Sequence, residues 1–125
     1  MSEKTLHRAI CDYIRLQYPG VQFNSDASGV RLTIKPATEM KALRSSRGFP
    51  DLMIFEPKGG YHALFIEIKA EGTALKVRNG DWVADKHIRE QAAFMELLKK
   101  KGYRAEFAVG FDNAKAIIDG YLKQK

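Results

Sequence analysis

Two short apolar runs, Gly48-Phe49-Pro50-Asp51-Leu52-Met53-Ile54-Phe55 and Leu64-Phe65-Ile66-Glu67-Ile68-Lys69, decide the fold of this chain. Both are rich in the aromatic and β-branched residues that favour strands, and residues 56–60 between them end in two glycines. Glycine readily adopts the positive φ that a tight turn requires. The pattern therefore predicts an antiparallel hairpin.

The second run places an acid and a base on one face of its strand. Successive side chains of a strand point to opposite faces, so Phe65, Glu67 and Lys69 share one face and the aliphatic residues between them share the other. If Asp51 lies opposite Glu67, or one diagonal step away, two carboxylates and an ammonium group converge at one strand end.

This arrangement indicates a site for a hard divalent cation. Two neighbouring carboxylates repel each other, and either protonation of one or binding of a metal relieves the repulsion. Mg²⁺ prefers oxygen ligands and keeps several waters, and the backbone carbonyl of Ile68 offers a further oxygen. Lys69 is placed to hold a phosphate oxygen or the attacking water. A metal site with such a lysine beside it is suited to phosphodiester hydrolysis.

The same residues resemble the PD-(D/E)XK nuclease superfamily, because Pro50-Asp51 matches its PD and residues 67–69 match its ExK. The order of the motifs along the whole chain resembles that of small stand-alone phage and prophage proteins of the VRR-NUC branch. That order is Gly-x-Pro-Asp, Glu-x-Lys, a helix with Gln91, a strand from Gly102-Tyr103 and a final helix over 112–122. The resemblance implies a single VRR-NUC-like nuclease domain over residues 1–125, with a restriction-endonuclease-like α/β core of a mixed central β-sheet flanked by helices.

The resemblance also implies a Mg²⁺-dependent DNA endonuclease in which Mn²⁺ substitutes for Mg²⁺. Lys69 would position or activate the attacking water, and Gln91 would orient water, the metal shell or the backbone. Glu3 also fits the dipole at the start of its own helix, so its role stays open. The implied catalytic residues are Asp51, Glu67, Lys69 and Gln91. The implied metal ligands are Asp51, Glu67, the Ile68 carbonyl and, as an outer ligand, Glu3.

The charge balance favours a polyanionic partner. The 125 residues include 21 Lys and Arg against 15 Asp and Glu, a net charge of +6. Several basic residues lie in two connections that flank the proposed site, where they either contact a phosphate backbone or are simply solvated. These candidate DNA-binding residues are Lys35, Lys41, Arg44, Arg47, Lys76 and Arg78. The single cysteine, Cys11, excludes an internal disulfide.

No signal peptide or membrane span is expected. The residues after Met1 lack an apolar run, and no segment approaches the ~20 apolar residues that a span requires. We therefore expect a cytoplasmic protein, and the resemblance places it in a bacterium or a phage-infected host cell.

The remaining pattern predicts helices and strands around the hairpin. The expected helices are 3–17 with Ser2 as N-cap, a short one at 39–44, 86–101 ended by Gly102, and 112–122 capped by Asp112 or Asn113. The expected strands are 21–23, 30–34 and 103–109. In the long connection 71–85, Trp82 is predicted to pack over the core. His7, His62 and His87 are predicted to be structural or surface residues.

Two alternative functions remain open, and one assembly and one substrate class are expected. A restriction-type or repair nuclease would use the same fold, and a nucleic-acid-binding subunit would keep the fold without turnover. A chain this small has one proposed active site, so cutting two strands or two arms is most simply done by a two-fold homodimer. By resemblance, the preferred substrate would be branched DNA such as Holliday junctions.

Overall fold

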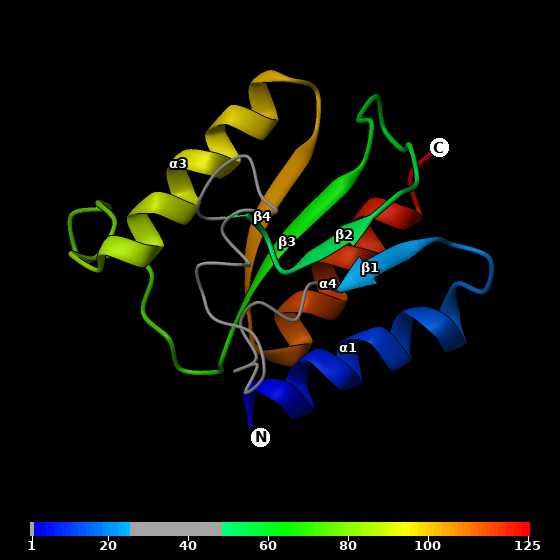
Figure 1. The fold of residues 1–125 in the computed structure, drawn as a ribbon, viewed down its shortest axis with the longest axis horizontal. Coiled ribbons are helices and arrows are strands. Elements are labelled where there is room, and N and C mark those ends of the chain that lie inside the picture. The colour runs from blue at the N-terminus through cyan, green and yellow to red at the C-terminus, as the bar shows by residue number, and fades with distance from the viewer. Residues whose placement is uncertain (1, 26–48) are drawn as a thin grey trace, which may run out of the picture.

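The computed structural model describes residues 2–25 and 49–125. Along the chain these form α1 (Glu3–Gln17), β1 (Phe23–Ser25), β2 (Leu52–Ile54), β3 (Leu64–Lys69), α3 (Lys86–Lys100), β4 (Arg104–Val109) and α4 (Gly110–Leu122) (Figure 1). The predicted strand 30–34 and short helix 39–44 lie outside the described residues. So do four of the candidate DNA-binding residues, Lys35, Lys41, Arg44 and Arg47.

The strands form one mixed sheet in the order β1-β2-β3-β4. The predicted hairpin is confirmed, because β2 and β3 pair antiparallel with Leu52 opposite Ile66. β4 then pairs parallel to β3, and the connection that this requires is α3 with the preceding loop. A mixed central sheet flanked by helices is therefore confirmed.

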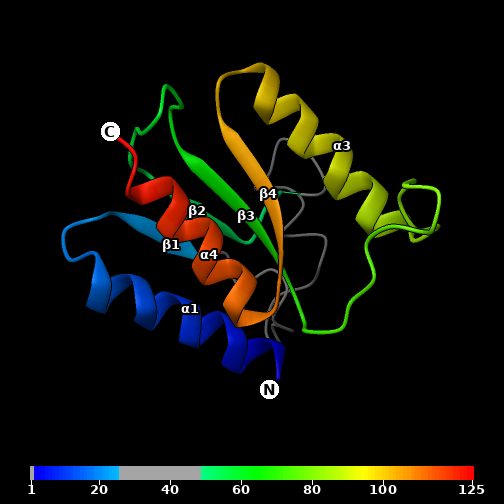
Figure 2. The same cartoon turned by 180° about the vertical axis from the view of Figure 1, so that it is seen from behind.

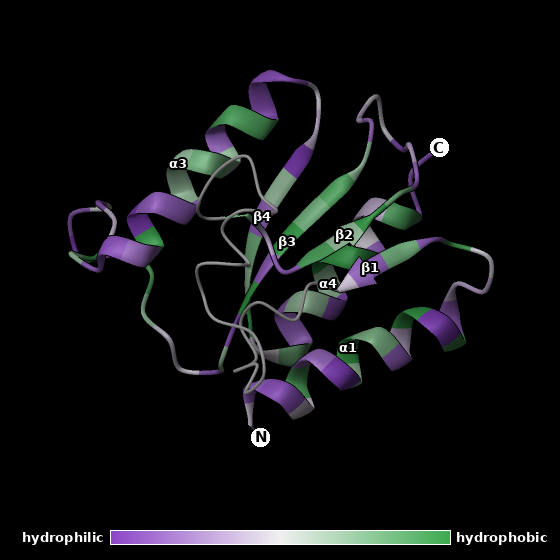
Figure 3. Cartoon of the chain, in the orientation of Figure 1, coloured by the Kyte–Doolittle hydropathy of each residue, from purple (hydrophilic) through white to green (hydrophobic). Residues whose placement is uncertain are grey.

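Helices cover both faces of the sheet. α1 and α4 lie side by side against one face, and α3 covers the other (Figures 1 and 2). The strands β2 and β3 are mostly hydrophobic, whereas the helices show hydrophobic and hydrophilic bands (Figure 3). The α1 and α4 side buries Leu64, Ile66 and Ile68, while Phe65 packs on the α3 side. The predicted alternation of side chains between the two faces of the strand over residues 64–69 is thus confirmed.

α1 is fixed at both ends. The Ser2 hydroxyl accepts a hydrogen bond from the Thr5 N–H at 3.1 Å, as expected of an N-cap. The hydroxyls of Tyr13 and Tyr18 both donate to Asp119 Oδ1 on α4, each at 2.6 Å. These bonds hold α1 on the sheet with its first turn beside the end of β3.

α3 has a capped start and a glycine end. The Asp85 carboxylate accepts hydrogen bonds from the N–H groups of His87 at 2.8 Å and Ile88 at 3.1 Å. Gly102, at φ +94°, follows the C-cap Lys101 in the left-handed conformation that favours glycine. α3 therefore has defined ends, and its buried face packs against Phe65 of β3 and Ala105 of β4.

Four element boundaries differ from the predictions, and one of them is at β4, which begins at Arg104 and not at residue 103. β1 lies two residues later than expected, and α3 ends one residue earlier. α4 begins at Gly110, where a φ of +82° turns the chain directly out of β4. The predicted N-cap at Asp112 or Asn113 is therefore wrong, because the N-cap is Val109, and Asn113 Oδ1 instead accepts the Val109 N–H at 2.8 Å. In the part of the chain that the structure describes, no helix is both long and apolar enough to span a membrane.

Candidate active site

A buried pair of carboxylates lies where β2 begins and β3 ends. Asp51 directly precedes Leu52, so continuing the register by one residue places Asp51 opposite Glu67. Both residues are only 4% exposed. Asp51 Oδ2 accepts a hydrogen bond from the Ile68 N–H at 2.9 Å, which fixes the carboxylate against the main chain of β3.

A lysine and an amide complete one side of this pair. The Lys69 Nζ lies 3.8 Å from Glu67 Oε1, and Gln91 Nε2 donates a hydrogen bond to the same oxygen at 2.7 Å. The parallel crossover places α3 over the face of β3 that carries Glu67, which explains how a residue 24 positions later reaches it. The structure thus brings together Asp51, Glu67, Lys69 and Gln91.

Burial and mutual repulsion change the protonation of the pair. Burial, and next the charge of Asp51, raise the pKa of Glu67 from 4.5 to about 9. Burial also raises the pKa of Asp51, although the adjacent Glu67 carboxyl and the Ile68 N–H favour its ionised form. Without a cation, the pair therefore holds a proton at neutral pH.

Several polar atoms at the site are buried without a hydrogen-bond partner among the described residues. They are Glu67 Oε2, Gln91 Oε1 and His7 Nε2. Buried polar groups almost always have partners, so three such atoms at one place indicate a site that is completed by a ligand. The donor set of carboxylate and amide oxygens fits a hard divalent cation.

Protein side chains alone do not form a closed metal cage here. Within residues 2–25 and 49–125, no three His, Cys, Asp or Glu side chains converge closely enough to hold an ion. A cation at the carboxylate pair would take its other ligands from backbone carbonyls and water, which is typical of Mg²⁺.

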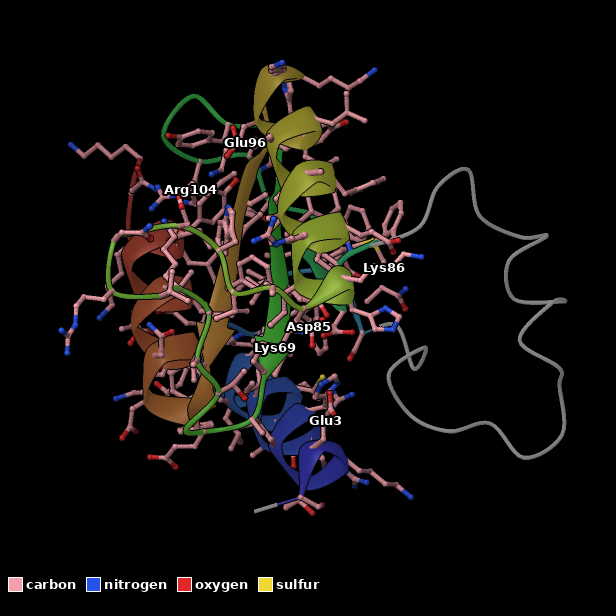
Figure 4. The ribbon with its side chains drawn as sticks, turned by 90° about the vertical axis from the view of Figure 1, so that its left-hand side faces the viewer. Glu3, Lys69, Asp85, Lys86, Glu96 and Arg104 are labelled. Carbon is pink, nitrogen blue, oxygen red and sulfur yellow. The ribbon has the colours of Figure 1, made fainter. Side chains whose placement is uncertain are left out.

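His7 lies inside this site and is buried, so the surface half of its structural-or-surface prediction is excluded. It is 6% exposed, and its Nε2 lies 4.0 Å from Asp51 Oδ2 and 4.0 Å from Glu3 Oε1. Glu3, whose side chain is half exposed, lies one helical turn earlier. Figure 4 shows Lys69 and Asp85 close together near the middle of the molecule, with Glu3 below them and Glu96 and Arg104 toward the upper end. The available signal was the i, i+4 spacing of Glu3 and His7 on the buried stripe of α1.

Comparison with known proteins agrees with this geometry. The sequence profile of the VRR-NUC domain matches residues 5–112. The chain belongs to the VRR-NUC family. A solved structure described as a "VRR_NUC domain protein" is 26% identical, with a TM-score of 0.70, over 99% of this chain and 90% of the other. A search among curated proteins found no match.

The VRR-NUC domain makes this chain a nuclease with a restriction-endonuclease-like α/β fold, and a nuclease domain implies DNA as its substrate. The motif residues Pro50, Asp51, Glu67 and Lys69 all lie within the matched range.

The connection between β3 and α3 contains a small hairpin-like loop over residues 75–83. Its backbone is closed by hydrogen bonds from the Val83 N–H to Leu75 O at 2.9 Å and from the Val77 N–H to Asp81 O at 2.8 Å. The Trp82 ring packs on Phe107 at 5.2 Å between ring centroids, which confirms its predicted packing role. The 75–83 loop is therefore ordered and anchored to β4.

Two of the predicted DNA-binding residues extend from this loop. Lys76 and Arg78 are exposed, and Lys76 Nζ lies 4.6 Å above the Trp82 ring. Arg89 on α3 donates hydrogen bonds to the backbone carbonyls of Val83 and Trp82, at 2.9 and 3.1 Å. The basic side chains are thus presented from a fixed base beside the start of α3.

The raised pKa of Glu67 predicts how the stability of the metal-free domain depends on pH. The folded state holds a proton that the unfolded state releases above its ordinary pKa of 4.5. The stabilisation is therefore complete below that pH and is lost as pH rises toward about 9. We expect the Tm in EDTA to fall, between pH 5 and pH 8, by at least ~5 °C more in the wild type than in Glu67→Gln. An equal fall of Tm with pH in the two proteins would contradict the raised pKa of Glu67.

Proposed function

We propose that this VRR-NUC domain is a Mg²⁺-dependent endonuclease of the PD-(D/E)XK type that hydrolyses DNA phosphodiester bonds. The observation that carries the proposal is the buried Asp51 and Glu67 pair, in which Glu67 Oε2 has no hydrogen-bond partner among the described residues and Lys69 Nζ lies 3.8 Å from the other oxygen. Carboxylate oxygens buried in a core normally have hydrogen-bond partners, so the unpartnered oxygen of Glu67 supports a role in binding a cation.

Each residue of the site has a role in this proposal. Asp51 and Glu67 hold the cation with the Ile68 carbonyl, whose main chain is already fixed by the bond from its N–H to Asp51. The bound cation supplies activation of a water molecule and neutralises charge on the phosphate, and Mn²⁺ serves in place of Mg²⁺. Lys69 holds the attacking water or a phosphate oxygen, because its ammonium group is the cationic donor beside the pair.

Gln91 and Glu3 have supporting roles in the proposal. Gln91 already orients Glu67 through its 2.7 Å hydrogen bond, and its free Oε1 is available to a water or to the cation shell. Glu3 acts as an outer ligand, since its carboxylate borders the site through His7.

The DNA backbone is proposed to run over the basic surface near the site. Lys76 and Arg78 would contact phosphates from the 75–83 loop, and Lys35, Lys41, Arg44 and Arg47 would contribute from the other connection. Such contacts set affinity rather than sequence preference. The net charge of +6 supports a binding mode dominated by phosphates.

Removing both loop cations tests this surface. In the double variant Lys76→Ala/Arg78→Ala we expect about tenfold weaker DNA binding, and a slope of log K against log salt that is reduced by about 2, because two phosphate contacts are lost. The matched control is Lys115→Ala/Lys123→Ala, on α4 and at its C-cap, against the opposite face of the sheet, with the same change in net charge. Equal losses in the two double variants would mean that only the net charge matters.

Branched DNA, with Holliday junctions as the example, is the proposed substrate class, and a homodimer is the proposed assembly. One site cuts one strand, so symmetric cutting of two arms requires two sites related by a two-fold axis. Exposed apolar side chains are available for an interface, among them Leu16 at 78% and Phe55 at 51% exposure.

The decisive experiment is cleavage of a four-way junction and of a linear duplex of equal length, at matched salt, with Mg²⁺ or with EDTA. We expect cutting only with the cation, preference for the junction, and a dimer mass by light scattering. Cutting in the presence of EDTA would overturn the proposal that cleavage requires a cation. A monomer that cuts both DNAs equally would contradict the proposed junction preference and the proposed dimer. The proposal that the protein is a nuclease would remain.

A further inference from the structure

A groove lies beside the aromatic contact that anchors the 75–83 loop to β4. It has a volume of about 460 Å³ between this loop, α3 and β4, and its apolar lining includes Ala92, Met95 and Ala105. Pockets of roughly 300–1,000 Å³ hold small organic ligands, so the groove has room for one nucleobase. It has no part in the cleavage chemistry proposed above.

The floor of the groove is aromatic and partly exposed. The Trp82 and Phe107 rings contact each other at 5.2 Å between centroids, and both side chains are only partly buried. Phe107 is the register partner of Glu67 on the neighbouring strand, and neighbouring strands lie about 4.8 Å apart. The aromatic floor therefore begins one strand away from the carboxylate pair.

A lysine covers the Trp82 ring. The Lys76 Nζ lies 4.6 Å from the ring centroid, and a β-bridge joins the two residues. Within residues 2–25 and 49–125, Lys76 forms no ion pair with a carboxylate, so a phosphate is a suitable partner for its charge. The other charged side chains that line the groove are already paired and take no part, Lys99 with Glu96 and Glu106 with Arg104.

We propose that the groove binds one unpaired nucleobase of the DNA substrate, which stacks on the Trp82 indole in place of the Lys76 ammonium group. Stacking of a base on an aromatic ring contributes more to binding than an exposed cation–π contact does. The displaced ammonium group pairs with a phosphate beside the same base, because its four-carbon stem is flexible. This inference rests on the proposed function and narrows its substrate class to DNA with an unpaired nucleotide near the cut.

The test uses two DNA duplexes of equal length and charge. One carries a single-thymine bulge, and the other carries an abasic residue at the same place. At matched salt, with EDTA to prevent cleavage, we expect the wild type to bind the thymine bulge about tenfold more tightly, measured by fluorescence anisotropy of labelled DNA. Trp82 is the single tryptophan of the chain, so its emission reports on the groove. The thymine bulge should quench this emission, and the abasic bulge should not.

Substitution of the ring gives a second readout. In Trp82→Leu the preference for the thymine bulge should disappear, whereas Trp82→Phe should keep a preference of about threefold, because a smaller ring still stacks. The matched control is Tyr61→Leu, which also removes a ring beneath a cation, since the Arg104 guanidinium lies 5.5 Å from the Tyr61 centroid. Tyr61 packs against the core on the α1 and α4 side, so its loss should leave the preference unchanged.

The outcomes separate the two proposals. Equal binding of the two bulges by the wild type, or a preference without a change in tryptophan emission, would overturn the role of the groove and leave the nuclease site standing. Failure to bind either DNA would also overturn it, and the nuclease proposal would fall too only if cleavage with Mg²⁺ were absent. If Trp82→Leu does not fold, the comparison of the two bulges on the wild type still decides.

Discussion

Replacing Glu67 with Gln, or Asp51 with Asn, is expected to lower DNA cleavage by about 10³-fold or more, because several kcal/mol of transition-state stabilisation depends on the cation that the pair holds. DNA affinity should stay the same or rise slightly, since an anion near the phosphate is removed while the basic surface is kept. Addition of Mg²⁺ or Mn²⁺ should no longer raise the Tm of either variant, because the cation then binds the folded state weakly.

Neither substitution should unfold the domain. With its pKa raised to about 9, metal-free Glu67 is already neutral at pH 7, so glutamine matches it in shape and charge. The glutamine oxygen can still accept from Gln91, and the asparagine oxygen can still accept from the Ile68 N–H. The apo proteins should therefore melt at or above the wild-type temperature, because folding at pH 7 no longer requires a buried carboxyl group to take up a proton.

The matched control is Glu96→Gln, which removes one negative charge at the other end of the molecule, where Glu96 pairs with Lys99 (Figure 4). It should cleave like the wild type. Full activity in Glu67→Gln or Asp51→Asn, measured against a mock purification to exclude a contaminating nuclease, would show that the pair does not hold the cation.

The hairpin and its acid-base face could be predicted because they depend on local alternation. Glu67 and Lys69 share a face by spacing alone, and the register that brings Asp51 opposite Glu67 follows from the strand pairing. The apolar stripe of α3 likewise predicted which side carries Gln91. These features need only the periods of strands and helices.

Other features could not be predicted because they depend on contacts between distant segments. His7 approaches Asp51, 44 positions later, because α1 packs in one core with the sheet and α4 and its tyrosines bond to Asp119. The 75–83 loop depends on the contact between Trp82 and Phe107, which lies on β4 much later in the sequence. The early start of α4 depends on one positive φ at Gly110.

Lys69→Met is expected to lower cleavage by about 10²–10³-fold, the usual cost of removing one charged donor from a transition state. The lysine is placed for its charge, since its Nζ lies 3.8 Å from Glu67 Oε1 and its side chain is 19% exposed. Methionine keeps the length and the packing of the stem, so the loss of stability should be small.

The response to cations distinguishes this variant from those at the carboxylates. Lys69→Met keeps both acids, so Mn²⁺ should still raise its Tm, whereas Glu67→Gln should show no rise. The matched control is Lys99→Met on the exposed side of α3, where the ion pair with Glu96 is solvated and worth little. If Lys69→Met instead unfolds while activity per folded molecule persists, then Lys69 serves only as the counter-ion of a buried acid. A loss of turnover with the fold and the cation response intact places its ammonium group at the phosphate or the attacking water.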